Sequence, residues 1–270
     1  MGADELLSAV LMGVVEGLTE FLPISSTGHL ILLGDVIGFR GPPGKVFEIS
    51  IQLGAILAVI WFMRDVLWRM ATRGWVPGTP AHRYTRTILL AFLPAMVLGA
   101  TLHRLITEQL FSSLIVAVAL IFGGGVIIAI ERWRPVPRIR SVLEISGPTA
   151  LLIGFGQVLA MVPGTSRSGA TIIVALLLGV DRRTAVEFSF MLAIPTILAA
   201  AAYSLWQSRA ALDNSELGQI AVGFVVSFVV ALGVVRWTMA IISRIGFAPF
   251  GWYRIALGAV ILAWLLLPPA

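Results

Sequence analysis

The chain of 270 residues contains no cysteine, which excludes disulfide bonds, thiolate nucleophiles and cysteine-ligated metal sites. It is also poor in charge: only 12% of its residues are Asp, Glu, Lys or Arg, against about 25% in soluble globular domains. The net charge of +5 sits in a few loops and forms no continuous basic patch of the kind that binds nucleic acid. Nucleic acid is therefore not expected as a partner.

Apolar residues make up 58% of the chain and occur in long runs. Each of the longer runs has the length that a helix needs to cross a bilayer. The sequence thus predicts an all-α integral membrane protein, a single membrane domain over residues 1–270, in which six segments form transmembrane helices: 47–63, 87–103, 110–130, 188–206, 217–235 and 254–268. A cleavable signal peptide is not expected, because the N-terminal flank is acidic and Glu16 and Glu20 interrupt the apolar region.

Two further apolar regions, 6–38 and 148–180, are interrupted by proline, glycine and hydroxyl residues at 23–28 and 163–169. The segment 168–180 would be about 20 Å long as a helix, whereas the hydrocarbon core of a bilayer is about 30 Å thick. Each region is therefore predicted to be a re-entrant helix hairpin. An alternative stays open, in which 145–166 crosses the membrane alone and the remainder is a surface loop.

The two interrupted regions also resemble each other. GVVEGLTEFLPISSTG, from residue 13, resembles GFGQVLAMVPGTSRSG, from residue 154. The comparison places Glu16 opposite Gln157 at an offset of 141 residues and Ser26 opposite Ser166 at an offset of 140. AILAVI and TILAAA match further on, again at an offset of 140–141 residues. Pseudo-repeats of about 1–131 and 142–270, each with an odd number of crossings, would have inverted topology. The hairpins would then enter from opposite faces, and their tips could meet near mid-membrane.

The basic residues indicate an orientation. Fourteen of the 19 Lys and Arg residues fall in loops predicted for one side: Arg64, Arg69, Arg73, Arg83, Arg86, Arg132, Arg134, Arg138, Arg140, Arg182, Arg183, Arg236, Arg244 and Arg254. Four fall on the other side: Arg40, Lys45, Arg104 and Arg209. Because cytoplasmic loops are rich in Lys and Arg, the first set is predicted to be cytoplasmic, with both termini and the first hairpin outward. Arg167 belongs to no loop.

Glu16 and Glu20 are spaced four residues apart, so they share one face of a helix. Two carboxylates inside apolar sequence are costly unless a cation neutralises them. Oxygen ligands suit Mg²⁺ or Ca²⁺, so the pair predicts a divalent cation site and a catalytic role. The alternative is a water-filled entrance to the hairpin, with both glutamates solvated.

Three hydroxyl residues, Ser25, Ser26 and Thr27, follow the break at Pro23. Any one of them could cap the next helix, but a cap needs only one hydroxyl. His29 follows Ser26 by three residues, close enough to share a face, and a Ser–His pair can make a hydroxyl nucleophilic. Spacing alone identifies no third member.

The second interruption has the composition of an anion site. Glycines such as Gly164 let backbone N–H groups approach an oxyanion, and Arg167 supplies a fork of donors that matches phosphate oxygens. Ser166, Ser168 and Thr171 add hydroxyl donors. An Arg167 ion pair with Glu16 or Glu20 is the alternative. Together the two interruptions supply the groups needed to break a phosphate ester or anhydride, and their depth implies a lipid substrate.

At EGLTEFLPISSTGH (16–29) and PGTSRSGAT (163–171) the sequence resembles the undecaprenyl-diphosphate phosphatase family of the bacitracin-resistance type. The resemblance covers nearly the whole chain. It implies hydrolysis of undecaprenyl diphosphate, a polyprenyl diphosphate lipid, to undecaprenyl phosphate and inorganic phosphate, which recycles the carrier lipid for peptidoglycan synthesis. It also implies resistance to bacitracin, which sequesters the substrate, use of a divalent cation, and an active site open to the outer face of the bacterial plasma membrane.

The resemblance also assigns roles by position. Glu16 and Glu20 match the acidic pair used in metal binding and catalysis, Ser26 the nucleophile, and His29 the base, with a nucleophilic His29 as a competing assignment. The matches to the phosphate-holding motif are Ser166, Arg167, Ser168 and Thr171, and the further substrate-binding candidates are Ser25, Thr27, Gly164 and Gln52. Gln52 could instead form only a hydrogen bond between helices.

A transporter is the main alternative, since inverted repeats with broken helices are typical of secondary transporters. A lipid flippase that also hydrolyses its substrate is a second. The Ser-Ser-Thr-Gly-His segment favours the enzyme, because a carrier needs no nucleophile beside an imidazole. The sequence predicts no oligomeric state.

Overall fold

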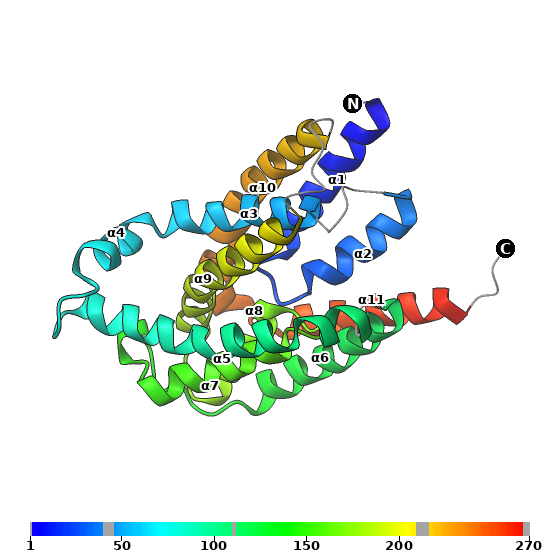
Figure 1. Cartoon of the computed structure of the whole chain (residues 1–270). Coiled ribbons are helices and arrows are strands. Elements are labelled where there is room, and N and C mark those ends of the chain that lie inside the picture. The colour runs from blue at the N-terminus through cyan, green and yellow to red at the C-terminus, as the bar shows by residue number, and fades with distance from the viewer. Residues whose placement is uncertain (1, 40–45, 110–111, 209–215, 267–270) are drawn as a thin grey trace.

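The computed structural model of the chain is a bundle of helices (Figure 1). It describes residues 2–39, 46–109, 112–208 and 216–266. In chain order the helices are α1 (Ala3–Thr19), α2 (Ser26–Ile37), α3 (Val46–Phe62), α4 (Arg64–Arg73), α5 (Pro80–Gln109), α6 (Ser113–Trp133), the 3₁₀ turn η2 (Val142–Glu144), α7 (Gly147–Leu159), α8 (Arg167–Leu177), α9 (Arg182–Ser208), α10 (Leu217–Ile245) and α11 (Ala248–Leu266). Over these ranges, one isolated bridge between Ile139 and Val180 is the only β pairing. The all-α prediction is confirmed.

Five helices are long and apolar enough to cross a membrane, namely α5, α6, α9, α10 and α11. The sixth predicted span is α3, which has 17 residues and bends by 78° into α4, so a sixth span is reached if the bent pair counts as one. The chain is therefore a multi-pass membrane protein. Pro94 and Pro195 lie inside α5 and α9 without ending them, as neighbouring helices in a bundle permit.

The predicted loop 236–254 is wrong. Helix α10 continues to Ile245 and α11 begins at Ala248, so only a short turn at Gly246 and Phe247 separates them. The arginines in this stretch suggested a loop, yet Arg236 and Arg244 belong to α10, and Arg254 lies fully buried inside the bundle. Of the four cations assigned to the opposite side, Arg40, Lys45 and Arg209 lie outside the described residues, as does the side chain of Arg104.

Each interrupted region forms two helices joined by a short loop. The break between α1 and α2 is at 20–25, and that between α7 and α8 is at 160–166. In both, the helix after the break is capped by a serine with positive φ, 72° at Ser25 and 74° at Ser166. The Ser25 hydroxyl accepts from the N–H of Gly28, and the Ser166 hydroxyl from that of Gly169. The caps therefore match Ser25 with Ser166, one residue earlier than the sequence comparison did.

These two serines are the only non-glycine residues with positive φ in the described part of the chain. That conformation is uncommon outside glycine and strained for a side chain with a Cβ. In both regions, therefore, the second helix begins with the same local structure, a serine N-cap with positive φ.

The two loops contact each other, as predicted. The hydroxyl of Ser168 donates to the carbonyl oxygen of Leu22 at 2.8 Å, and that of Ser166 to the same oxygen at 3.5 Å. Next to this contact, the Phe21 ring packs edge-on against Phe190 of α9, with ring centroids 5.3 Å apart. Segments about 140 residues apart in the sequence therefore meet at the centre of the bundle.

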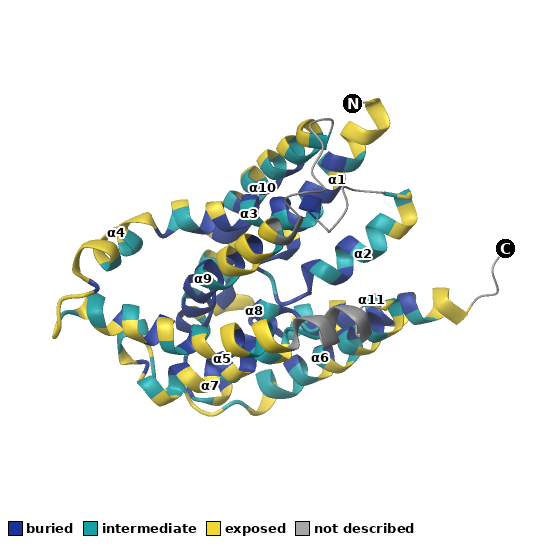
Figure 2. Cartoon of the chain, in the orientation of Figure 1, coloured by how far each residue is buried: buried dark blue, intermediate teal, exposed yellow. Residues whose placement is uncertain are grey.

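Helix α9 forms much of that centre. Within its membrane-length window 61% of the residues are buried, against 22–33% in the other four. The outer helices pack through glycine. A Cβ on Gly13 of α1 would lie 2.6 Å from the carbonyl oxygen of Gly223 in α10, and one on Gly154 of α7 would lie 2.3 Å from that of Ala91 in α5. Small residues of this kind let helix backbones approach closely in membranes. Figure 2 shows the buried residues gathered around α9 and the exposed ones on the outer faces.

Candidate active site

A polar pocket of about 180 Å³ lies where α2 and α8 begin. It is lined by Glu20, Ser25, Ser26, Thr27, Gln52, Ala160, Gly164, Ser166, Arg167, Thr196, Ile197 and Ala200. Eight of the twelve predicted site residues are in this lining. The free N–H groups and the dipole at the start of a helix favour an anion, and here the first turns of two helices flank one pocket.

Ser26 is held by a carboxylate. Its hydroxyl donates to Oε2 of Glu20 at 2.5 Å, and both residues are buried. Hydrogen bonds from a hydroxyl to an ionised carboxylate are among the shortest and strongest in proteins. Glu20, the C-cap of α1, is therefore placed to accept the Ser26 proton.

Arg167 joins this pair from α8. Its Nη2 lies 3.4 Å from Oε1 of Glu20, and its Nη1 donates to the carbonyl oxygen of Ser189 at 3.1 Å. The alternative ion pair between Arg167 and a glutamate is therefore the arrangement found. Nε of Arg167 is buried and has no hydrogen-bond partner among the described residues. One donor of the guanidinium is therefore not used by the described residues.

Glu16 lies one turn before Glu20 and is fully buried. Neither of its carboxylate oxygens has a hydrogen-bond partner in the part of the chain that the structure describes. The solvated-entrance alternative is therefore wrong for Glu16. Sequence reasoning missed Glu48 of α3, whose Oε2 is also buried and has no hydrogen-bond partner among the residues that the structure describes.

A cation site at Glu16 and Glu20 would have few protein ligands. No group of three His, Cys, Asp or Glu side chains within the described ranges is arranged to hold a metal ion. Mg²⁺, however, is often held by only one or two carboxylates, with substrate phosphates and water completing its shell. The two orphaned oxygens of Glu16, next to Glu20, fit that kind of site.

His29 is not where the sequence predicted it. Its Nδ1 lies 2.7 Å from the carbonyl oxygen of Ser25, and its Nε2 lies 2.7 Å from the hydroxyl of Tyr253 on α11. Because a carbonyl only accepts, Nδ1 carries the proton and Nε2 faces Tyr253. The expected Ser26–His29 pair is therefore wrong: both ring nitrogens are engaged elsewhere, and His29 does not line the pocket.

Ser168 and Thr171, predicted to hold phosphate, are also outside the lining. Ser168 is bonded to Leu22, as described above, and to the hydroxyl of Ser166 at 3.1 Å. Thr171 shares a 2.7 Å hydrogen bond with the hydroxyl of Ser189. Both hydroxyls join α8 to its neighbours, so the residues support the pocket wall and do not face the cavity.

Two other features of the pocket were missed by sequence reasoning. Thr196 of α9 lines the pocket and exchanges hydrogen bonds with Gln157 of α7, at 3.1 Å and 3.3 Å. Arg254 reaches both loops from α11. The only sequence signal for Arg254 was the apolar run that follows it, which suits a helix better than a loop.

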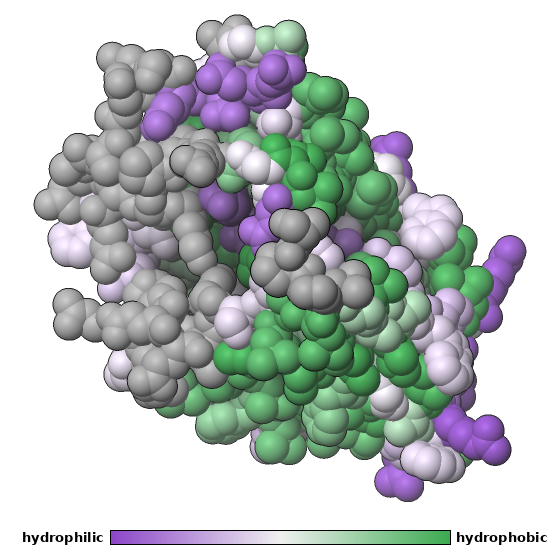
Figure 3. Space-filling model, turned by 90° about the vertical axis from the view of Figure 1, so that its right-hand side faces the viewer, coloured by the Kyte–Doolittle hydropathy of each residue, from purple (hydrophilic) through white to green (hydrophobic). Residues whose placement is uncertain are grey.

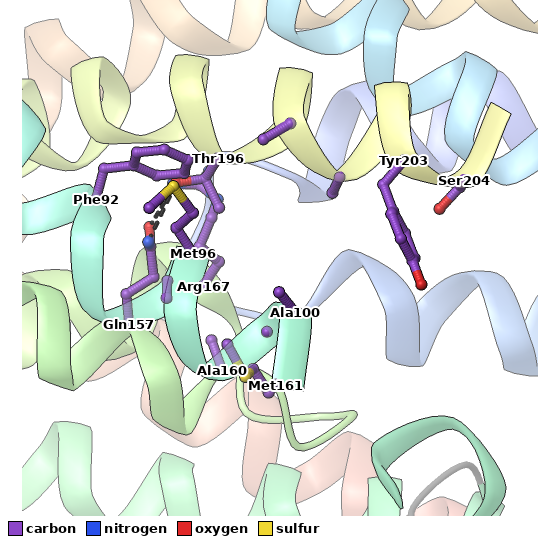
Figure 4. Close-up of a pocket in the computed structure, with 14 residues that line it drawn as sticks. Phe92, Met96, Ala100, Gln157, Ala160, Met161, Arg167, Thr196, Tyr203 and Ser204 are labelled. Atoms are coloured by element: carbon purple, nitrogen blue, oxygen red, sulfur yellow. Dashed lines mark hydrogen bonds between the residues drawn. The ribbon is translucent and has the colours of Figure 1, made fainter. Parts of the chain in front are cut away.

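An apolar cleft of about 370 Å³ adjoins the polar pocket (Figure 4). The two cavities share Ala160, Arg167, Thr196 and Ala200. The remaining residues that line the cleft come from α5, α7, α9 and the loop after α7: Phe92, Ala95, Met96, Gly99, Ala100, Gln157, Met161, Ala199, Tyr203 and Ser204. A molecule with a charged head and an apolar tail could therefore lie across both, with its head at Arg167.

Known proteins resemble the chain over nearly its whole length. An undecaprenyl-diphosphatase 2 from Paramagnetospirillum magneticum is 53% identical over 262 residues, which cover 97% of this chain and 100% of the relative. An undecaprenyl-diphosphatase from Sphingopyxis alaskensis is 51% identical over 97% of this chain and 98% of its own. One from Dechloromonas aromatica is 50% identical over 96% of this chain and 94% of its own.

The family model described as bacitracin resistance protein BacA matches residues 9–260. That range contains all twelve predicted site residues and the loops that carry them. With the matching relatives, it establishes that the chain belongs to the BacA family of bacitracin resistance proteins.

Proposed function

We propose that the protein hydrolyses undecaprenyl diphosphate to undecaprenyl phosphate and inorganic phosphate. This reaction would recycle the lipid carrier for peptidoglycan synthesis and confer resistance to bacitracin, which sequesters the diphosphate. The names of the relatives and the family support the activity. The observation that carries it is the Ser26–Glu20–Arg167 cluster in a polar pocket beside an apolar cleft.

The shapes of the two cavities support a lipid diphosphate as substrate. The diphosphate would occupy the polar pocket, near the first turns of α2 and α8 and the Arg167 guanidinium. Planar guanidinium groups match phosphate oxygens with two parallel hydrogen bonds. The polyprenyl chain would leave through the apolar cleft lined by α5 and α9.

Ser26 is the proposed nucleophile. Its oxygen attacks the terminal phosphorus while Glu20 takes the hydroxyl proton over the 2.5 Å hydrogen bond. The bond from that phosphorus to the bridging oxygen breaks, and undecaprenyl phosphate leaves with the bridging oxygen. Glu20 gives the proton it took from Ser26 to the leaving phosphate oxygen and is ionised again. It then takes a proton from a water molecule, which attacks the phosphorus of the phosphoserine. The bond from that phosphorus to the Ser26 oxygen breaks, the proton returns to Ser26, and inorganic phosphate is released. Arg167 leaves its ion pair with Glu20 and binds the phosphate, where it stabilises the negative charge that develops on the phosphate oxygens.

A nucleophilic or basic His29 is less consistent with the contacts, since both of its ring nitrogens are bonded away from the pocket. We assign His29 to holding the start of α2 against Tyr253. Ser25, Thr27, Gly164, Ser166 and Gln52 would surround the diphosphate. Ser168 and Thr171 would support Arg167 from behind.

The proposed cofactor is a divalent cation, Mg²⁺ or Ca²⁺. Glu16 would hold it together with Glu20, because Glu16 has two buried oxygens that no described residue satisfies. When bound, such a cation neutralises charge on the diphosphate.

We also propose that the two broken helices are re-entrant hairpins of an inverted-topology repeat, with pseudo-repeats of about 1–131 and 142–270. The matched caps at Ser25 and Ser166 support this, as does the packing of α1 on α10 and of α7 on α5. Each hairpin thus packs on a long helix from the other half of the chain.

We also propose that the protein lies in the bacterial plasma membrane, with its active site open to the outer face. The arginines of α4 and those at the end of α6 and the start of α9 are at the end of the bundle that this orientation makes cytoplasmic. Figure 3 shows the opposite end, where hydrophilic atoms are visible in a recess beside a hydrophobic surface. This recess supports entry of the head group from outside.

A transporter with this architecture would not need the Ser26–Glu20 hydrogen bond, which prepares a hydroxyl for attack. The test is release of phosphate from undecaprenyl diphosphate by purified protein in detergent, with Mg²⁺, with Ca²⁺ and with EDTA. Metal-dependent release that Ser26→Ala abolishes is the expected result. Well-folded wild-type protein that releases no phosphate with either metal would contradict the proposal and favour a carrier.

A further inference from the structure

Arg254 of α11 is fully buried at the centre of the bundle. Each of its guanidinium N–H groups donates to a backbone carbonyl. Nη1 bonds Pro23 at 3.2 Å and Thr165 at 2.8 Å, and Nη2 bonds Gly164 at 2.9 Å. The remaining two bonds are Nη2 to Ala119 at 3.1 Å and Nε to Leu120 at 3.4 Å.

These five bonds use all the donors that a guanidinium has. Arg254 therefore has none left for a substrate, and it does not line either cavity near the active site. No carboxylate within the described ranges pairs with it. Burying a charge that only carbonyl oxygens satisfy lowers the stability of the folded protein. The position of Arg254 therefore indicates a role that offsets this cost.

Three of the five carbonyls that Arg254 binds belong to the two loops beside the polar pocket, and the other two belong to α6. Pro23 stands two residues before Ser25, in the loop that delivers Ser26. Gly164 lines the pocket itself, and Thr165 lies two residues before Arg167. One planar, rigid group thus fixes the spacing between the loop with the nucleophile and the loop with the phosphate-binding arginine.

We infer that Arg254 is a positioning residue of the proposed hydrolysis, which sets the distance between the Ser26 loop and the Arg167 loop. The expected effect of Arg254 on the rate rests on the proposed function. Its expected effect on the distance between the two loops does not. A misplacement of about 1 Å in reacting groups can lower a rate about 100-fold. Loss of the guanidinium geometry should therefore lower kcat more than it changes KM.

Two glycines of α6 offer a matched test in which Arg254 itself is not mutated. A Cβ on Gly123 would lie 2.2 Å from Nη2 of Arg254, so Gly123→Ala must displace the guanidinium. A Cβ on Gly125 has no neighbour within 4 Å, so Gly125→Ala leaves it undisturbed. Both variants make the same chemical change in the same helix and gain the same helix propensity.

The first readout is geometric and needs no activity. The chain has no cysteine, so Val36→Cys on α2 and Leu177→Cys on α8, both exposed, can be spin-labelled selectively. Gly123→Ala is expected to shift or broaden the label–label distance distribution, and Gly125→Ala to leave it as in the wild type. An unchanged distribution in Gly123→Ala would overturn the inference, whatever the protein hydrolyses.

The second readout is steady-state hydrolysis of undecaprenyl diphosphate. Gly123→Ala is expected to lower kcat about 10- to 100-fold with KM changed less than about threefold, at a thermal midpoint close to that of Gly125→Ala. Arg254→Lys keeps the positive charge but loses the planar set of guanidinium donors. It is also expected to lower kcat with little change in KM. Equal kcat values in the two alanine variants would overturn the inference. If the wild type releases no phosphate, the proposed function is contradicted. The role of Arg254 in setting the loop spacing would then still be tested by the label–label distances.

Discussion

The hydroxyl of Ser26, at the start of α2, donates a 2.5 Å hydrogen bond to Oε2 of Glu20, at the end of α1. The other oxygen of Glu20 faces Nη2 of Arg167, at the start of α8. One carboxylate therefore connects the two broken helices and joins the proposed nucleophile to the proposed phosphate-binding group.

Replacement of Glu20 by glutamine removes the proton acceptor and keeps the shape of the side chain. General base catalysis contributes about 10²- to 10⁴-fold, so kcat of Glu20→Gln should fall by that factor. Phosphate release from undecaprenyl diphosphate measures it. Asp35→Asn, an exposed change in the same hairpin, is the control and should retain full activity. A Glu20→Gln enzyme with wild-type kcat would remove Glu20 from proton transfer.

Glu16 should show a conflict between stability and activity. Its buried carboxylate has no hydrogen-bond partner among the described residues. A neutral amide costs less to bury than a charge, so Glu16→Gln should stabilise the metal-free protein by about 1–3 kcal/mol. The same change should move the Mg²⁺ dependence of activity to higher concentration, because a carboxylate ligand is lost. Thermal unfolding in EDTA and a metal titration measure the two effects. If the titration is unchanged, Glu16 is not a ligand.

Arg167→Lys keeps the positive charge and removes the two-pronged donor geometry. A missing donor to a developing oxyanion costs about 10²- to 10³-fold, so kcat should fall by that amount. Arg183→Lys, an exposed change near the start of α9, is the matched control. Near-wild-type turnover by Arg167→Lys would exclude bidentate phosphate binding.

His29 and Tyr253 should behave as one unit. Their side chains are 2.7 Å apart and their rings lie within 2° of parallel. The stability losses of His29→Ala and Tyr253→Phe should therefore be non-additive, with a coupling free energy of about 0.5–3 kcal/mol. A double-mutant cycle of thermal unfolding measures it. Additive losses would show that the contact contributes nothing to stability.

The apolar cleft should select for chain length. Ala199→Phe fills the cleft, and overpacking of about 1.4 kcal/mol should raise KM for undecaprenyl diphosphate about tenfold. Farnesyl diphosphate, whose chain is much shorter, should be affected less. Val229→Phe, on the exposed face of α10, is the control. Equal effects on both substrates would place the polyprenyl chain elsewhere.

Eleven of the twelve candidate residues were found from the sequence because they lie in the two apolar regions that are interrupted; Gln52 is the exception. Helix breaks are local events, caused by Pro23 and by the glycines and hydroxyls around Gly164, and polar residues there have few structural uses in a membrane. Eight of the twelve line the pocket. The long apolar runs likewise determined the helices, since backbone groups in lipid must be satisfied within a helix.

Partners across the bundle could not be inferred in this way. That Ser26 bonds Glu20 and not His29 depends on the positive φ of Ser25, the capping serine before it. This angle turns the chain at the start of α2 by an amount that spacing does not encode.

Arg254 shows the limit most clearly. In the sequence it is one more arginine near the end of a predicted loop, and charge counting placed it in water. In the folded chain it contacts carbonyls from residues 23, 119, 120, 164 and 165. The sequence by itself determined which residues are candidates for the chemistry, because composition and local breaks are encoded locally. Only the tertiary structure decided which of them touch, because those contacts are set by how distant helices pack.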